Sequence, residues 1–71
     1  MNERISQVIV ITLNQRLIAV DTNTAGIHRK FKDVEPNFWG YDKLHKLLKS
    51  NDYLLFTIDN KTYHIEIYRN K

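Results

Sequence analysis

The sequence predicts an α+β fold, a small winged helix in which three helices precede a C-terminal β-hairpin. The main observation is the stretch of residues 36–68, which predicts an aromatic-glycine turn, a short basic amphipathic helix and then two strands. A basic helix followed by a hairpin is typical of the closing half of a winged helix. The second observation is length: 71 residues predict a single domain, residues 1–71, near the lower size limit for folding without added supports.

Composition narrows the ways in which so small a domain is stabilised. The chain has no cysteine, which excludes disulfides and thiolate metal sites, so the core depends on aliphatic side chains and eight aromatic ones. No stretch approaches the roughly 18–20 continuous apolar residues of a membrane helix, and no signal peptide is apparent. We therefore expect a cytoplasmic protein with no membrane association.

Residues 5–20 are open to two interpretations. Their apolar residues recur at spacings of three and four, which favours a helix. These residues are Ile5, Val8, Ile9, Leu13, Leu17 and Val20. The β-branched run of residues 8–11 and the pair Asn14-Gln15 instead favour a β-hairpin, because β-branched side chains lose rotamer freedom in a helix. The winged helix requires the helix; a hairpin here would give a ββαββ-type fold.

A second helix is predicted over residues 24–33. Polar side chains in residues 21–24 are suited to accept from the free amides of its first turn. The helix would turn Ile27 and Phe31 inward and its basic residues outward. Pro36 cannot continue a helix and biases Glu35 toward an extended conformation, so the helix ends before it.

Residues 41–50 are predicted as the third helix, after a turn at Gly40. Its apolar stripe lies at relative positions 0, 3, 6 and 7, and its opposite face is charged. Residues 53–58 and 62–68 are then two strands joined by a turn at residues 59–61. In the second strand Tyr63, Ile65 and Ile67 alternate with polar residues, which predicts one buried and one exposed face.

Positive charge is concentrated in the second part of the chain. Residues 1–27 are neutral, whereas residues 28–71 hold nine Lys or Arg against six Asp or Glu, which accounts for the net charge of +3. Clustered cations favour a polyanionic partner through phosphate contacts, although a solvated surface is the alternative. The candidate nucleic-acid-binding residues are Arg29, Lys30, Lys32, Tyr41, Lys43, Lys46, Lys49 and Lys61.

These candidates have different expected roles. Lys43, Lys46 and Lys49 repeat every three residues, so they would project from neighbouring turns of one helix toward successive phosphates. Lys61 would lie at the tip of the wing. Tyr41 and Trp39 flank Gly40, and either ring would serve as a core plug or as a stacking platform for an unpaired base.

The segment PNFWGYDKL, residues 36–44, resembles the proline-to-leucine signature of LOTUS domains, also called OST-HTH domains. The resemblance lies in the step Trp39-Gly40-Tyr41 and the pair Lys43-Leu44, with residues 25–31 similar to the family's second helix. It implies a winged helix without enzymatic activity that binds RNA, including structured and guanine-rich RNA. Some members of the family dimerise or dock onto RNA helicases.

We therefore expect a non-catalytic RNA-binding module that recognises structured RNA, duplex or guanine quadruplex, through its basic third helix and wing. The alternative is a protein-interaction module that self-associates or docks on a partner through the apolar run of residues 8–13 and the exposed part of the C-terminal hairpin. An unpaired edge strand such as residues 63–68 would also serve as a pairing surface. DNA reading is disfavoured because the helix lacks Arg, Asn and Gln. No catalytic set, metal site or cofactor is expected, since His28, His45 and His64 fall on different elements.

Overall fold

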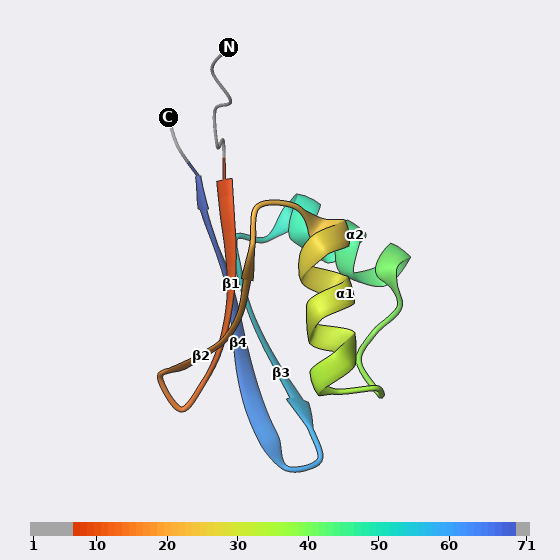
Figure 1. The fold of residues 1–71 in the computed structure, drawn as a ribbon. Coiled ribbons are helices and arrows are strands. Elements are labelled where there is room, and N and C mark those ends of the chain that lie inside the picture. Colours follow the sequence, from red (N-terminus) through yellow and green to blue (C-terminus); the bar gives the residue numbers. More distant parts are fainter. Residues whose placement is uncertain (1–6, 70–71) are drawn as a thin grey trace.

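In the computed structural model, two helices cover one face of a four-stranded antiparallel sheet (Figure 1). The structure describes residues 7–69. The elements in chain order are β1 (Gln7–Leu13), β2 (Arg16–Asp21), α1 (Thr24–Val34), α2 (Tyr41–Ser50), β3 (Tyr53–Ile58) and β4 (Lys61–Arg69).

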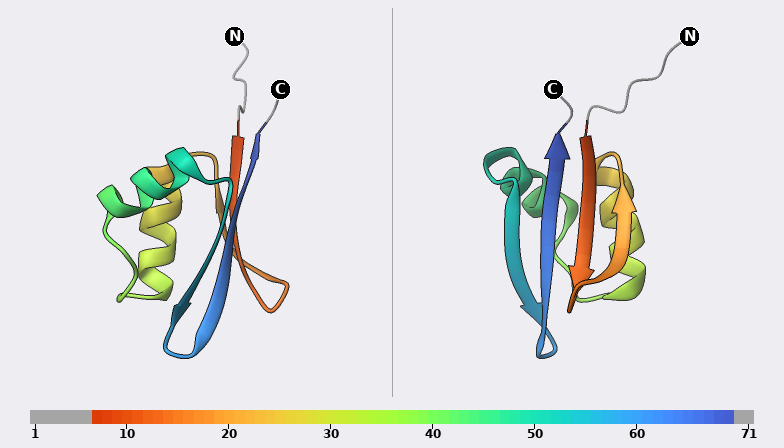
Figure 2. Two further views of the ribbon diagram at one scale, coloured as in Figure 1. Left: turned by 180° about the vertical axis from the view of Figure 1, so that it is seen from behind. Right: turned by 90° about the vertical axis from the view of Figure 1, so that its left-hand side faces the viewer.

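The sheet consists of two hairpins joined through their long strands. The strand order is β2-β1-β4-β3, so β1 and β4 form the centre and β2 and β3 the edges. In the central pair Ile9 lies opposite Ile67 and Ile11 opposite Ile65. Both helices lie on the same side of this sheet, and the right-hand view of Figure 2 looks onto the other side, which no helix covers.

The core lies between the helices and the covered face of the sheet. Alternation along the central strands directs Ile9, Ile11 and Ile65 inward, and all three are fully buried. Phe31 of α1 lies at the middle of an aromatic cluster, with its ring centroid 4.6 Å from that of Phe38 and 4.9 Å from that of Tyr63. Edge-on contacts of this kind add to the stabilisation that burial alone provides.

The predicted winged helix is wrong. Residues 7–21, where the winged helix requires its first helix, form the hairpin β1–β2. Along the chain, two helices therefore follow one hairpin and precede another. Ile5, part of the predicted stripe, lies outside the described residues. The hairpin alternative agrees with the structure at this point but differs from it in having one helix rather than two.

Tight turns with left-handed backbone explain the two hairpins. Asn14 and Gln15 have φ values of 51° and 67°, and Asp59 and Asn60 have 51° and 65°. Two successive residues with positive φ form the turn whose twist matches that of paired strands. Asn and Asp tolerate this conformation better than most residues, which favours both turns.

The remaining elements agree with their predicted positions. α2 spans the predicted residues, and α1 extends one residue beyond the prediction, to Val34. The side chain of Asn23 caps α1 by accepting from the amide of Gly26 at 2.7 Å. In β4 Tyr63, Ile65 and Ile67 are buried as predicted.

Candidate functional site

The uncovered face of the sheet is unusually apolar for a surface exposed to water. Antiparallel partners lie on the same face, so the register places the outward side chains in rows across the strands. One row is Tyr53, Glu66, Val10 and Val20, and the next is Leu55, His64, Thr12 and Leu17. Five of the seven large hydrophobic side chains that are exposed within residues 7–69 lie on this face: Leu17, Val20, Tyr53, Leu55 and Tyr68.

The polar groups of this face are largely satisfied by one another. The Tyr53 hydroxyl lies 2.7 Å from Nδ1 of His64, and the Tyr68 hydroxyl donates to Oε1 of Glu66 at 3.0 Å. The bond to Glu66 raises the pKa of Tyr68. Among the outward positions of the described strands, Glu66 is the one acidic side chain, and none is Lys or Arg.

The structure does not gather the predicted basic residues into one free surface. The Lys30 ammonium lies 3.2 Å from Oδ2 of Asp21, and that of Lys61 lies 3.2 Å from Oε2 of Glu35. Lys32 donates to the Phe38 carbonyl at 2.8 Å, which holds the loop between the helices. These three lysines therefore have intramolecular roles.

The other predicted cations are more exposed. Lys43 lies over the Trp39 ring, 5.1 Å from its centroid, in a cation–π contact. Arg29, Lys46 and Lys49 are exposed and have no acidic partner among residues 7–69. They lie on the helical layer, which the sheet separates from the uncovered face.

The two aromatic candidates differ in their surroundings. Trp39 packs against the core, with its ring centroid 4.9 Å from that of Phe56, so it acts mainly as a core plug. Tyr41 is exposed, but its ring stacks on His45 at 5.5 Å between centroids. One face of the Tyr41 ring is therefore already occupied.

A buried carboxylate, Glu35, has a structural environment rather than a catalytic one. Its Oε2 accepts from the Tyr63 hydroxyl at 2.7 Å and from Lys61 at 3.2 Å. The Tyr63 bond lowers the pKa of Glu35 despite the opposing effect of burial. Burial and the neighbouring carboxylate raise the pKa of Tyr63 to about 12. The pair thus joins the end of α1 to β4, and neither residue lines the pocket described next.

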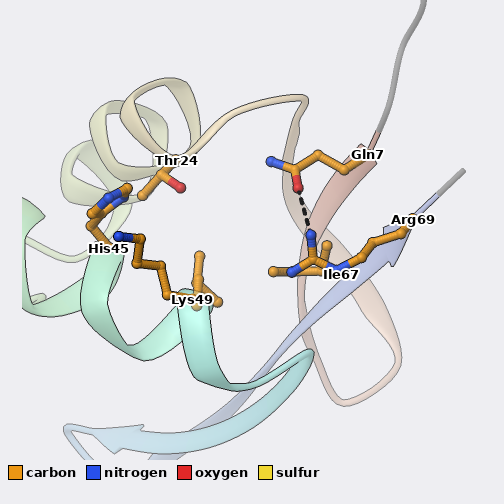
Figure 3. A pocket seen from close by; sticks show the side chains of 7 residues that line it. Gln7, Thr24, His45, Lys49, Ile67 and Arg69 are labelled. Atoms are coloured by element: carbon orange, nitrogen blue, oxygen red, sulfur yellow. Dashed lines mark hydrogen bonds between the residues drawn. The ribbon is translucent and has the colours of Figure 1, made fainter.

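A pocket of about 260 Å³ lies between the helices and the sheet, where β1 begins and β4 ends. Its lining, most of which is labelled in Figure 3, is Gln7, Thr24, His45, Leu48, Lys49, Ile67 and Arg69. Lys49 and His45 reach it from α2, whereas Gln7 and Arg69 face them from the central strands (Figure 3). Within residues 7–69, no group of three or more potential metal ligands occurs.

The comparisons with known proteins do not assign the chain. No family model, curated protein or solved structure matches it. Among the described helices, none has the length and apolar character needed to cross a membrane. The function must therefore be inferred from the two surfaces, the uncovered sheet face and the pocket.

Sequence reasoning missed the pocket and identified the uncovered face only in part. It named residues 8–13 and the exposed part of the C-terminal hairpin as a docking surface, but it took residues 63–68 for an unpaired edge, whereas they lie in the central strand β4. The outward residues of β1 and β2 were hidden in a pattern that also fits a helix, although Tyr53, Leu55 and Tyr68 alternate with buried residues and were recognisable as exposed. Of the pocket residues, only Lys49 was a candidate. Gln7 and Arg69 are 62 positions apart, and nothing in the chain's local pattern indicates that they meet.

Proposed function

We propose that this domain is a non-catalytic protein-interaction module that self-associates by packing the uncovered sheet faces of two copies against each other. The observation that carries the proposal is the concentration of exposed hydrophobic side chains on that face. Contiguous apolar patches on small domains mark interaction sites, because water contact with them is unfavourable.

The charge distribution favours a second copy as the occupant. In a two-fold interface the same patch meets itself, so a strongly charged patch would repel its copy. Here the face has a single acidic residue, Glu66, already bonded to Tyr68, and no outward Lys or Arg on the described strands. Among the described residues, most exposed cations lie on the helices, and the exposed cations of the strands occupy positions that alternate away from this face: Arg16, Lys61 and Arg69. All of them would lie outside the interface, where their repulsion is screened.

The size of the face sets the expected strength. A patch of four strands, each about six residues long, has a flat projected area of roughly 400 Å². The side chains that stand out from the sheet are not included in this area. The projected area is below the roughly 600–1,000 Å² per partner that stable specific interfaces bury and within the range of weak, transient ones. We therefore expect a reversible dimer with a dissociation constant in the micromolar range or weaker.

Leu55→Lys tests the proposal, and Val34→Lys is its matched control. Leu55 is 56% exposed on the uncovered face, and Val34 is 49% exposed at the end of α1. Both changes replace a similarly exposed apolar side chain with a cation, but only Leu55→Lys places like charges within the interface. Lysine is also well tolerated on an edge strand and at a helix C-terminus, so both variants should fold.

The measurement is the weight-average mass by sedimentation equilibrium from micromolar to millimolar concentration. The native chain and Val34→Lys should rise toward the dimer mass, whereas Leu55→Lys should stay monomeric. A native chain that remains monomeric throughout would overturn self-association. A dimer that Leu55→Lys leaves unchanged would contradict the use of this face.

A second candidate function, RNA binding, is supported by the exposed cations of α2. Lys43, Lys46 and Lys49 remain exposed on successive turns, and none pairs with an acid among residues 7–69. Replacing all three with glutamate should abolish salt-sensitive binding in fluorescence-anisotropy titrations with single-stranded, duplex and quadruplex RNA and matching DNA. Unchanged binding by the folded triple variant would exclude α2 as the RNA surface.

A further inference from the structure

The pocket between α1, α2 and the central strands collects hydrogen-bond donors from three directions. Lys49 and His45 project from adjacent turns of α2, Thr24 lies in the first turn of α1, and Arg69 lies at the end of β4. Among residues 7–69, no Asp or Glu lines the pocket. Leu48 and Ile67 supply its apolar part. Such a lining favours an anionic ligand.

The sheet side of the pocket is held in place before any ligand arrives. Nη1 of Arg69 donates to Oε1 of Gln7 at 3.2 Å, the bond drawn in Figure 3. The Gln7 amide in turn donates to the Thr22 carbonyl at 3.4 Å. A fixed guanidinium loses less side-chain freedom when it binds, which favours affinity.

One acidic residue lies close to this arrangement. Asp52 Oδ1 accepts from Nε of Arg69 at 3.0 Å and lies 3.0 Å from Nη2. The Asp52 side chain is 65% exposed, so solvent screens its charge and it offsets that of Arg69 only in part. Lys49 has no acidic partner among the described residues, so the pocket keeps a net positive charge.

We propose that this pocket binds the phosphoryl group of a phosphomonoester. A phosphomonoester carries about −1.5 to −2 charge near neutral pH and three strong acceptor oxygens. That charge and those acceptors match the Lys49 ammonium and Arg69 guanidinium, with Thr24 and His45 beside them, better than a singly charged carboxylate does. The volume of about 260 Å³ admits a phosphoryl group with a small organic group attached.

Two ligand sources share this chemistry, a free small phosphomonoester and the terminal phosphate of an oligonucleotide. The first experiment titrates the full chain with inorganic phosphate and monitors the amide chemical shifts by NMR. Sodium chloride at matched ionic strength is the reference. The same titration is then made with ribose 5-phosphate and with a pair of oligonucleotides, one with and one without a 5′-phosphate. Tighter binding of the sugar phosphate indicates the free source, and a preference for the phosphorylated oligonucleotide indicates the terminal one.

Lys49→Gln and Arg16→Gln form the matched pair of variants. Both remove one exposed cation, but only Lys49 lines the pocket, whereas Arg16 lies opposite Leu13 at the other end of β1. Lys49→Gln should weaken phosphate binding at least about tenfold, as expected for loss of a charge-assisted contact, and Arg16→Gln should change it less than about twofold.

Equal weakening by the two variants would overturn the proposal, because it would indicate diffuse attraction to the positive charge of the whole chain. The proposal would also be overturned if phosphate produced no saturable amide shifts in the native chain, or if chloride produced the same shifts. The result is separate from self-association, since Leu55→Lys alters the opposite face of the sheet.

Discussion

Replacing Gly26 with alanine should destabilise the domain, although alanine is the better helix former. A Cβ atom at this position would overlap the Asp21 carboxylate, including its Cγ. The Asp21 side chain would have to move, and it accepts from the Thr22 amide at 2.6 Å and pairs with Lys30 at 3.2 Å. Gly26 therefore allows the Asp21 side chain to approach the first turn of α1 closely.

The expected effect is the difference between opposing contributions. Alanine gains at most about 1 kcal/mol over glycine in a helix interior, and less near an end. Overpacking costs about 1–3 kcal/mol, and the partly exposed ion pair adds about 0–1 kcal/mol. The midpoints of these ranges give a net loss of about 2 kcal/mol. Each 1 kcal/mol lowers Tm by about 4–8 °C in a domain of this size.

The assay is urea unfolding followed by circular dichroism, with all variants made in the Leu55→Lys background so that self-association does not affect apparent stability. The decisive control is the same Gly26→Ala change in a chain that also carries Asp21→Ala. Without the carboxylate the alanine should be neutral or stabilising, so the sign of its effect should reverse. Destabilisation of equal size in both backgrounds would show that the clash is not with Asp21, and stabilisation in both would refute the close approach.

The remaining predictions concern the pH dependence of stability, to which the bond between Glu35 and Tyr63 contributes at both ends. Because the pKa of Glu35 is lowered in the folded state, its contribution is present above its ordinary value of 4.5 and is lost as the pH falls below it. Because the pKa of Tyr63 rises from 10.0 to about 12, its contribution is present below pH 10 and is lost between these values. Urea midpoints measured from pH 3 to 12 should fall at both ends, and Tyr63→Phe should flatten the alkaline fall; an unchanged alkaline fall in that variant would contradict the assignment.

The sequence predicted the second half of the fold because its signals there agree with one another. In α2 an apolar stripe lies opposite a charged face, and in β4 buried and exposed residues alternate. Gly40 and Pro36 confine the helices at the expected places. Each element could therefore be located from local pattern alone.

The predicted first helix was wrong because both faces of the N-terminal hairpin are apolar. Ile9 and Leu13 face the helices, whereas Val8, Leu17 and Val20 lie on the uncovered face. Combining the two sets produces spacings of three and four that resemble a helix. The ambiguous pattern and the candidate interface thus have the same cause, an apolar outward face on a half-covered sheet.

The basic residues show why charge clusters alone could not locate a site. Lys61 pairs with Glu35, 26 positions away, and Lys32 holds a loop carbonyl, so neither is free for a ligand. Conversely, Arg69 was not among the predicted binding residues, yet the pairing of β1 with β4 brings it to the pocket, where its acidic partner Asp52 is largely exposed. Which cations are available depends on contacts between distant segments, which one sequence does not reveal.

The sheet separates the two proposed binding surfaces, and this has a consequence for how they would work together. The pocket opens among residues of the helices and the covered side of β1 and β4, whereas Leu55 and its neighbours lie on the uncovered side. Two copies packed through their uncovered faces would therefore leave both pockets accessible. A dimer would then present two phosphate sites, and a ligand with two phosphates spaced to reach both would bind more tightly than either site alone. If Leu55→Lys removed that gain while leaving inorganic phosphate binding unchanged, the two surfaces would be shown to act in one assembly.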